Sequence, residues 1–95
     1  MIREADGRLY VSGPVTMENA LELLESGSRY LGGSQTVIDF SEVSEIDSSS
    51  VSLMLEWSRR ARAAGGQVRF ANLGEAITSL TDLYGVKDLI PLDAS

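Results

Sequence analysis

The residues best placed for chemistry lie in the segment 45–50, which reads Glu-Ile-Asp-Ser-Ser-Ser. An acid, Asp47, precedes three hydroxyls at the expected start of a helix, where backbone N–H groups lack partners within the helix. In one reading, Asp47 or Ser48 simply caps the helix by accepting a hydrogen bond from one of these N–H groups. In the other, an exposed serine accepts a phosphoryl group, whose charge the helix N-terminus stabilises, or forms the centre of a docking surface. The spacing leaves both readings open.

The sequence lacks two residue types on which most hydrolases depend. The 95 residues include no His and no Cys, which excludes the usual general base, a thiolate nucleophile and the common serine triad. Lys87 is the only lysine, and the sequence contains neither a glycine-rich phosphate loop nor a dinucleotide fingerprint. We therefore expect a chain that is not an enzyme and that needs no cofactor.

The charge balance narrows the set of partners. Eight basic residues stand against 14 acidic ones, giving a net charge of −6, which disfavours binding to nucleic acid. Four acids suggest a divalent cation, but they lack the EF-hand spacing, and a solvated acidic loop is the favoured reading: Asp39, Glu42, Glu45 and Asp47. No apolar run approaches the roughly 20 residues of a membrane span, and the N-terminal segment lacks an apolar signal core. We expect a cytoplasmic chain with no direct membrane insertion.

The pattern of apolar residues and turn signals predicts an α/β fold in a single domain, residues 1–95. An N-terminal hairpin is expected at 2–4 and 9–12 around Asp6-Gly7, followed by alternating helices and strands on a small mixed sheet. Further strands are expected at 36–40, 67–71 and 89–92, with 41–50 as a polar connection.

Three helices are expected between these strands. The first begins at a cap on Thr16 and turns four apolar side chains toward the core, namely Met17, Leu21, Leu24 and Leu31. The second covers residues 51–64 and stops at Gly65-Gly66. The third carries an apolar stripe of Leu73, Ile77, Leu80 and Tyr84, and Gly85 with Val86 predicts a left-handed C-cap with its apolar contact.

The second helix has two distinct faces when residues are placed about 100° apart. Its core side is expected to hold Ser50, Met54, Trp57, Ala61 and Ala64, with Val51 and Leu53 on the shoulders. Its opposite face carries Ser48, Ser52, Leu55, Arg59 and Arg62. A solvated face and a protein-docking face both fit this pattern, because single exposed leucines and arginines are ordinary on protein surfaces.

The segment 46–55, Ile-Asp-Ser-Ser-Ser-Val-Ser-Leu-Met-Leu, resembles the signature of STAS domains, the family shared by anti-sigma-factor antagonists and sulfate-transporter tails. In that family a strand leads into Asp-Ser/Thr, a small residue and an aliphatic helix. The resemblance implies the STAS fold, like that of anti-sigma-factor antagonists. It makes Ser48, directly after Asp47, the regulatory hydroxyl whose phosphorylation in those antagonists breaks partner binding, with Ser49 and Ser50 as competing acceptors.

The second half of the chain resembles more narrowly the small STAS subunit of the Mla phospholipid ABC transporter, the toluene-tolerance type. The matching residues are 53–57 (Leu-Met-Leu-Glu-Trp), Arg59, Gly65-Gly66, 68–73 (Val-Arg-Phe-Ala-Asn-Leu) and 80–86 (Leu-Thr-Asp-Leu-Tyr-Gly-Val). This resemblance implies a non-catalytic cytoplasmic subunit, peripheral to the inner membrane, that binds the transporter's ATPase and through it the permease. The complex would support retrograde phospholipid transport and outer-membrane lipid asymmetry.

The residues expected to bind that partner are Asp47, Ser48, Ser49, Ser52, Leu55, Arg59 and Arg62. We expect Leu55 to supply an apolar contact and the two arginines a charged rim. The alternative function is an anti-sigma-factor antagonist, whose partner would be an anti-sigma factor kinase that phosphorylates Ser48.

Overall fold

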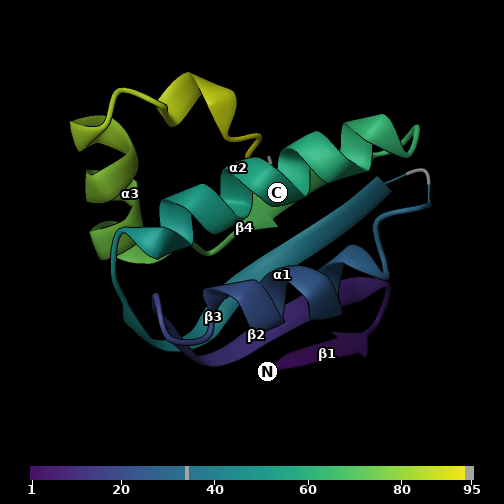
Figure 1. Ribbon diagram of the computed structural model, residues 1–95, viewed down its shortest axis with the longest axis horizontal. Coiled ribbons are helices and arrows are strands. Elements are labelled where there is room, and N and C mark those ends of the chain that lie inside the picture. The colour runs from purple at the N-terminus through teal and green to yellow at the C-terminus, as the bar shows by residue number, and fades with distance from the viewer. Residues whose placement is uncertain (34, 94–95) are drawn as a thin grey trace.

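The computed structural model describes residues 1–33 and 35–93. Along the chain the elements are β1 (Ile2–Ala5), β2 (Arg8–Val15), α1 (Ala20–Ser28), β3 (Gln35–Ile46), α2 (Ser49–Ala63), β4 (Gln67–Ala71), α3 (Gly74–Leu83) and the 3-10 helix η1 (Lys87–Leu89). The described strands form one sheet in the order β1-β2-β3-β4 (Figure 1). β1 runs antiparallel to β2, and the other neighbours are parallel. The expected α/β architecture with an N-terminal hairpin is confirmed.

The opening hairpin turns where the sequence predicts. Asp6 and Gly7 both have positive φ angles, 55° and 75°, as a two-residue turn matching the strand twist requires. The register then pairs Ala5 with Arg8 and Ile2 with Val11.

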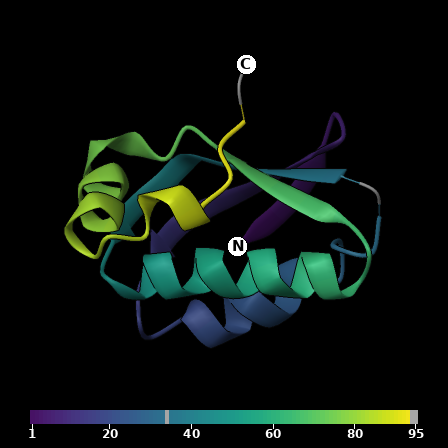
Figure 2. The same cartoon turned by 90° about the horizontal axis from the view of Figure 1, so that it is seen from above.

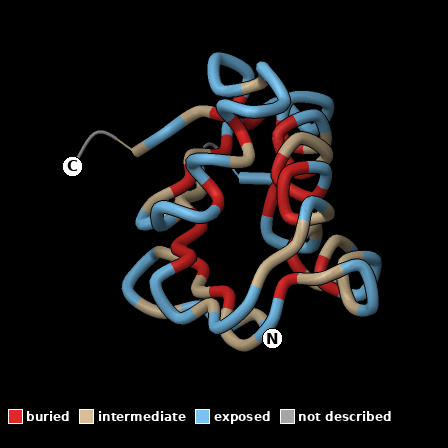
Figure 3. The backbone as a smooth tube through the Cα atoms, turned by 90° about the vertical axis from the view of Figure 1, so that its left-hand side faces the viewer, coloured by how far each residue is buried: buried red, intermediate tan, exposed pale blue. Residues whose placement is uncertain are grey.

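The core lies between the sheet and the two helices α1 and α2, which run side by side along one face of the sheet (Figure 2). Buried stretches of the backbone concentrate on that interior side (Figure 3). Strand residues Leu9, Ile38 and Phe70 meet Met54 and Trp57 of α2 there. α3 covers one end of the sheet, with Ile77 buried. The predicted core side of α2 is confirmed except for Ala64, which is exposed because the helix ends at Ala63.

A glycine lets α1 approach α2 closely. Gly27 faces the Trp57 indole, and a Cβ at this position would lie 2.6 Å from the nearest ring carbon. The same indole donates a hydrogen bond from Nε1 to the Leu24 carbonyl oxygen at 3.2 Å. Trp57 therefore holds α1 in place by both shape and hydrogen bonding.

The predicted start of the first helix is wrong. α1 begins at Ala20, because Asn19 closes a turn before it: its Oδ1 accepts the Thr16 N–H at 2.9 Å and its Nδ2 donates to the Pro14 carbonyl at 2.7 Å. Within α1 the buried residues are Leu23 and Gly27. Of the four side chains predicted to face the core, Leu31 is buried and Leu24 packs against the core, whereas Met17 and Leu21 are 77% and 72% exposed.

The connection expected at residues 41–50 is also wrong in part. β3 continues to Ile46, because residues 42–46 pair with 12–15 of β2 across two register shifts. Backbone pairing thus overrides the polar composition of this segment. Near the C-terminus the reverse occurs, since the strand expected at 89–92 is reduced to η1 and a single bridge between Phe70 and Leu92.

The end of α3 follows the predicted capping pattern. Gly85 has φ 68°, the Val86 N–H reaches the Thr81 carbonyl at 3.0 Å and the Gly85 N–H reaches Asp82 at 3.1 Å, which is the Schellman arrangement. The chain turns away at this cap, so Tyr84 is exposed and does not complete the expected apolar stripe.

Candidate functional site

The three serines before and within the first turn of α2 have three different environments. Ser50 is fully buried and its hydroxyl donates to the Asp47 carbonyl at 2.8 Å. Ser49 is half-buried and its hydroxyl donates to the Asp47 carboxylate. Ser48 is exposed, and its hydroxyl makes no hydrogen bond with any residue that the structure describes. Of the three hydroxyls, that of Ser48 is the one open to a partner.

The Asp47 carboxylate anchors this tip of α2. Its Oδ1 accepts the Ser49 N–H at 2.9 Å, and its Oδ2 accepts the Met17 N–H at 2.9 Å. The Ser49 hydroxyl and then these backbone N–H groups lower the pKa of Asp47 below its ordinary value, so the carboxylate is charged at neutral pH. The Asp47 side chain therefore supplies the hydrogen-bond acceptor at the N-terminal end of α2, and the Ser48 side chain does not. The carboxylate also ties the turn before α1 to the start of α2.

The exposed face of α2 carries the other expected partner-binding residues. Ser52, Arg59 and Arg62 are exposed and Leu55 is half-buried. Together with Leu89 and Pro91 from the C-terminal segment they line an open groove of about 570 Å³, here called the α2 groove. The structure thus brings this face into a concave surface that the helical pattern alone did not predict.

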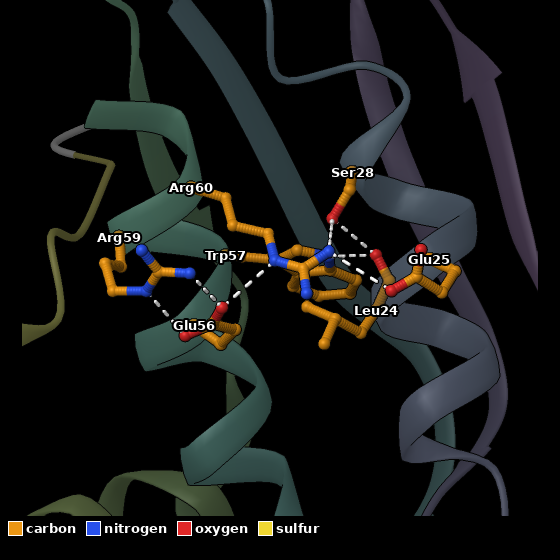
Figure 4. A network of polar contacts seen from close by, with 7 residues as sticks. All are labelled: Leu24, Glu25, Ser28, Glu56, Trp57, Arg59 and Arg60. Carbon is orange, nitrogen blue, oxygen red and sulfur yellow. Dashed lines mark hydrogen bonds and ion pairs between the residues drawn. The ribbon is translucent and has the colours of Figure 1, made fainter. Parts of the chain in front are cut away.

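An ion-pair network occupies one side of that face (Figure 4). Glu56 accepts two hydrogen bonds from Arg59, at 2.9 and 2.6 Å, and one from Arg60 Nε at 3.0 Å. Arg60 also reaches Glu25 and Ser28 of α1, each at 3.2 Å. These arginines lower the pKa of Glu56 to about 2.

The network distinguishes the two arginines expected at the charged rim. Arg59 forms an ion pair with Glu56, whereas Arg62 has no ion-pair partner among the described residues. Sequence reasoning missed Glu56 and Arg60 as members of this surface. Their spacing of three and four residues was the available signal, because side chains at those separations meet on a helix.

The acidic residues considered for a cation do not form a site. They lie on or just after β3, so the expected loop is wrong, although Glu42 and Glu45 are exposed to solvent. Asp39 is buried and accepts hydrogen bonds from Arg8 at 2.8 Å and Asn72 at 2.9 Å, while Glu42 pairs with Arg3 at 2.6 Å. Within residues 1–33 and 35–93, no three acidic side chains are grouped to hold a metal ion.

Asp39 instead holds strands together. Burial raises the pKa of this carboxyl, but hydrogen bonds from Ser41, Arg8 and Asn72 outweigh it and leave the pKa below its ordinary value. The charged Asp39 thereby joins β2, β3 and the end of β4. Its partners Arg8 and Asn72 lie 31 and 33 residues away, and nothing in the sequence pattern connects them.

Among the described helices, none has the length and apolar character needed to cross a bilayer.

Comparison with known proteins gives a consistent family assignment. A family model described as "Mlab, STAS domain" matches residues 2–91. The anti-sigma-B factor antagonist of Bacillus subtilis (strain 168) is 29% identical over 83 residues, covering 87% of this chain and 71% of that protein.

Solved structures agree on the fold. The anti-sigma factor antagonist SpoIIAA in its unphosphorylated form aligns with a TM-score of 0.73 at 15% identity, covering 100% of this chain and 88% of that one. The Bacillus cell fate determinant SpoIIAA in its phosphorylated form aligns with a TM-score of 0.68 at 15% identity, covering 100% and 91%.

Proposed function

The chain belongs to the STAS domain family, and we propose that it is a non-catalytic subunit that binds the ATPase of an Mla-type phospholipid ABC transporter. It would act in the cytoplasm, held at the inner membrane through the ATPase and the permease. The description of the matching family model supports this choice, as do the segments 53–57 and 80–86 that resemble the transporter's STAS subunit. ATP hydrolysis would belong to the partner, since this chain has no His or Cys and no phosphate loop.

The observation that carries the proposal is the exposed hydroxyl of Ser48 at the tip of α2, which makes no hydrogen bond with the described residues. It lies one helical turn before Ser52, which lines the α2 groove. A partner lying along this face would bury the half-exposed Leu55 and meet the Ser48 hydroxyl at one end and Arg62 at the other. This combination of an apolar centre and a polar rim is typical of protein interfaces.

The test is co-purification with the cognate ATPase of the transporter. Ser48→Glu places a charge at the tip, and Leu55→Arg places one in the groove, so each should weaken the complex by about tenfold or more. Matched controls are Ser79→Glu and Leu83→Arg on α3, which make the same changes at exposed positions on another element. Unchanged binding by both α2 variants, or equal losses in the α3 controls, would reject this surface.

An anti-sigma-factor antagonist remains the second candidate, favoured by the 29% identity with the Bacillus subtilis antagonist. The serine environments favour it too, because the Ser48 hydroxyl makes no hydrogen bond with the described residues, whereas those of Ser49 and Ser50 are hydrogen-bonded. A phosphate on Ser48 would add about −1.5 to −2 charges close to the Asp47 carboxylate and repel an acidic partner.

Affinity purification with mass spectrometry separates the two candidates. Recovery of an ABC ATPase with unmodified Ser48 supports the transporter subunit. Recovery of a kinase-like anti-sigma factor, with phosphate on Ser48, supports the antagonist.

A further inference from the structure

A second cavity lies at the other end of α2, where the helix ends and β4 begins. It has a volume of about 310 Å³ and is lined by Ser58, Arg62, Gly66, Gln67, Val68, Arg69 and Pro91; it is here called the β4 pocket. The β4 pocket adjoins the α2 groove, because the two share Ser58, Arg62 and Pro91. Its lining includes two guanidinium groups and no carboxylate.

The two arginines are unusual within this acidic chain. Four other arginines pair with carboxylates, namely Arg3, Arg8, Arg59 and Arg60. Neither Arg62 nor Arg69 has a carboxylate within ion-pair distance among the described residues, and Arg69 donates only to the Leu92 carbonyl, at 3.4 Å. Within the described residues, two arginines without a carboxylate partner therefore share one cavity, although the chain carries a net charge of −6. Such a site attracts an anion.

Ser58 provides a second and independent observation. Its residue is 3% exposed, and its hydroxyl is the one buried side-chain polar atom in the described chain without a hydrogen-bond partner. A buried hydroxyl in this state costs free energy, because it has lost water and gained no acceptor. An acceptor oxygen entering the β4 pocket would supply the missing hydrogen bond.

We propose that the β4 pocket binds a phosphate group between Arg62 and Arg69, with the Ser58 hydroxyl as a third donor. The planar guanidinium fork matches the oxygens of a phosphate, and two such groups suit a doubly charged anion better than a single carboxylate. The phosphate can belong to a soluble ester or to a lipid headgroup, which present the same oxygens. This site lies at the opposite end of α2 from Ser48. It shares Arg62 with the α2 groove, whereas Arg69 lies outside that groove.

The test is a titration of the isotope-labelled full chain with inorganic phosphate, followed by amide NMR shifts at constant ionic strength with chloride as reference. Saturable shifts should be confined to residues around the β4 pocket. Arg62→Gln and Arg69→Gln should each weaken binding by about tenfold, since each removes a charge-assisted contact. Ser58→Ala should weaken it a few-fold without lowering Tm, because the variant removes the unpaired hydroxyl.

Arg29→Gln is the matched control, because Arg29 is an exposed arginine directly after α1 that is also free of ion pairs in the described chain and lies outside the pocket. It should leave phosphate binding unchanged. The same titration with glycerol 3-phosphate, and flotation with phosphatidylcholine vesicles with and without phosphatidylglycerol, identifies the source. Saturation by the soluble ester supports a soluble ligand, whereas binding only to the anionic vesicles supports a lipid headgroup.

Three results would overturn the assignment. One is the absence of saturable shifts up to tens of millimolar phosphate, well beyond the roughly millimolar range of weak specific binding. The second is an equal loss of binding in Arg29→Gln, which would indicate diffuse charge attraction. The third is tighter binding of a hexaglutamate peptide than of either phosphate compound, which would assign the pocket to an acidic protein segment.

Discussion

Replacing Gly27 with alanine tests how closely α1 and α2 are packed. The added Cβ would lie 2.6 Å from one Trp57 ring carbon and 2.8 Å from its neighbour, whereas such atoms normally approach to about 3.5–4.0 Å. The indole is fully buried, so either the ring or the helix must move by about 1 Å to restore ordinary contact. Overpacking of this kind typically costs about 1–3 kcal/mol.

The substitution also has a favourable part. Alanine stabilises a helix by roughly 0.5–1 kcal/mol relative to glycine. The expected net loss is therefore about 1–2 kcal/mol, or about 5–15 °C in Tm for a domain of this size. Because Trp57 is the only tryptophan, its fluorescence should shift as the ring is displaced.

Thermal and urea unfolding, followed by circular dichroism and fluorescence, measure the effect. Gly32→Ala is the matched control, since a Cβ there meets no atom within 4 Å, and its stability should not fall. In a Trp57→Phe background the smaller ring makes room, so Gly27→Ala should cost much less than in the wild type. A Gly27→Ala variant as stable as the wild type would refute the reasoning.

Two further changes test other parts of the fold. Gly66→Ala should destabilise the chain more than Gly27→Ala, by over about 2 kcal/mol, because the new Cβ would collide with the Gly33 backbone carbonyl rather than a side chain; a urea midpoint close to that of Gly32→Ala would contradict this. Asp39 should contribute stability that is fully present above its ordinary pKa of 3.8 and is lost as pH falls through its lowered folded-state pKa. Asp39→Asn should therefore be less stable than the wild type at pH 7, and its free energy of unfolding should fall less on acidification. An equally steep fall at acidic pH in the variant and the wild type would contradict this role of Asp39.

The sequence determined the features that depend on local chemistry. The Asp6-Gly7 turn, the strand at 67–71 and the cap at Gly85 each follow from the conformational preferences of a few neighbouring residues. The core side of α2 follows from helical period, and the segment around Asp47-Ser48 identified the family.

Tertiary contacts decided what local patterns could not. The polar second half of β3 is a strand because β2 lies beside it, and α1 starts late because the Asn19 side chain reaches back to Pro14. Asp39 finds partners more than 30 residues away, and the β4 pocket joins Arg62 to Arg69 across a helix end.

The same division holds at the candidate site. The spacing of residues in the sequence supplied three adjacent serines without ranking them, and only the family resemblance pointed to Ser48. Folding ranks them, because packing buries Ser50, the Asp47 carboxylate engages Ser49, and Ser48 remains in solvent. Which hydroxyl stays free depends on the direction each side chain takes from the helix end, and that direction is set only when α2 is packed against the sheet.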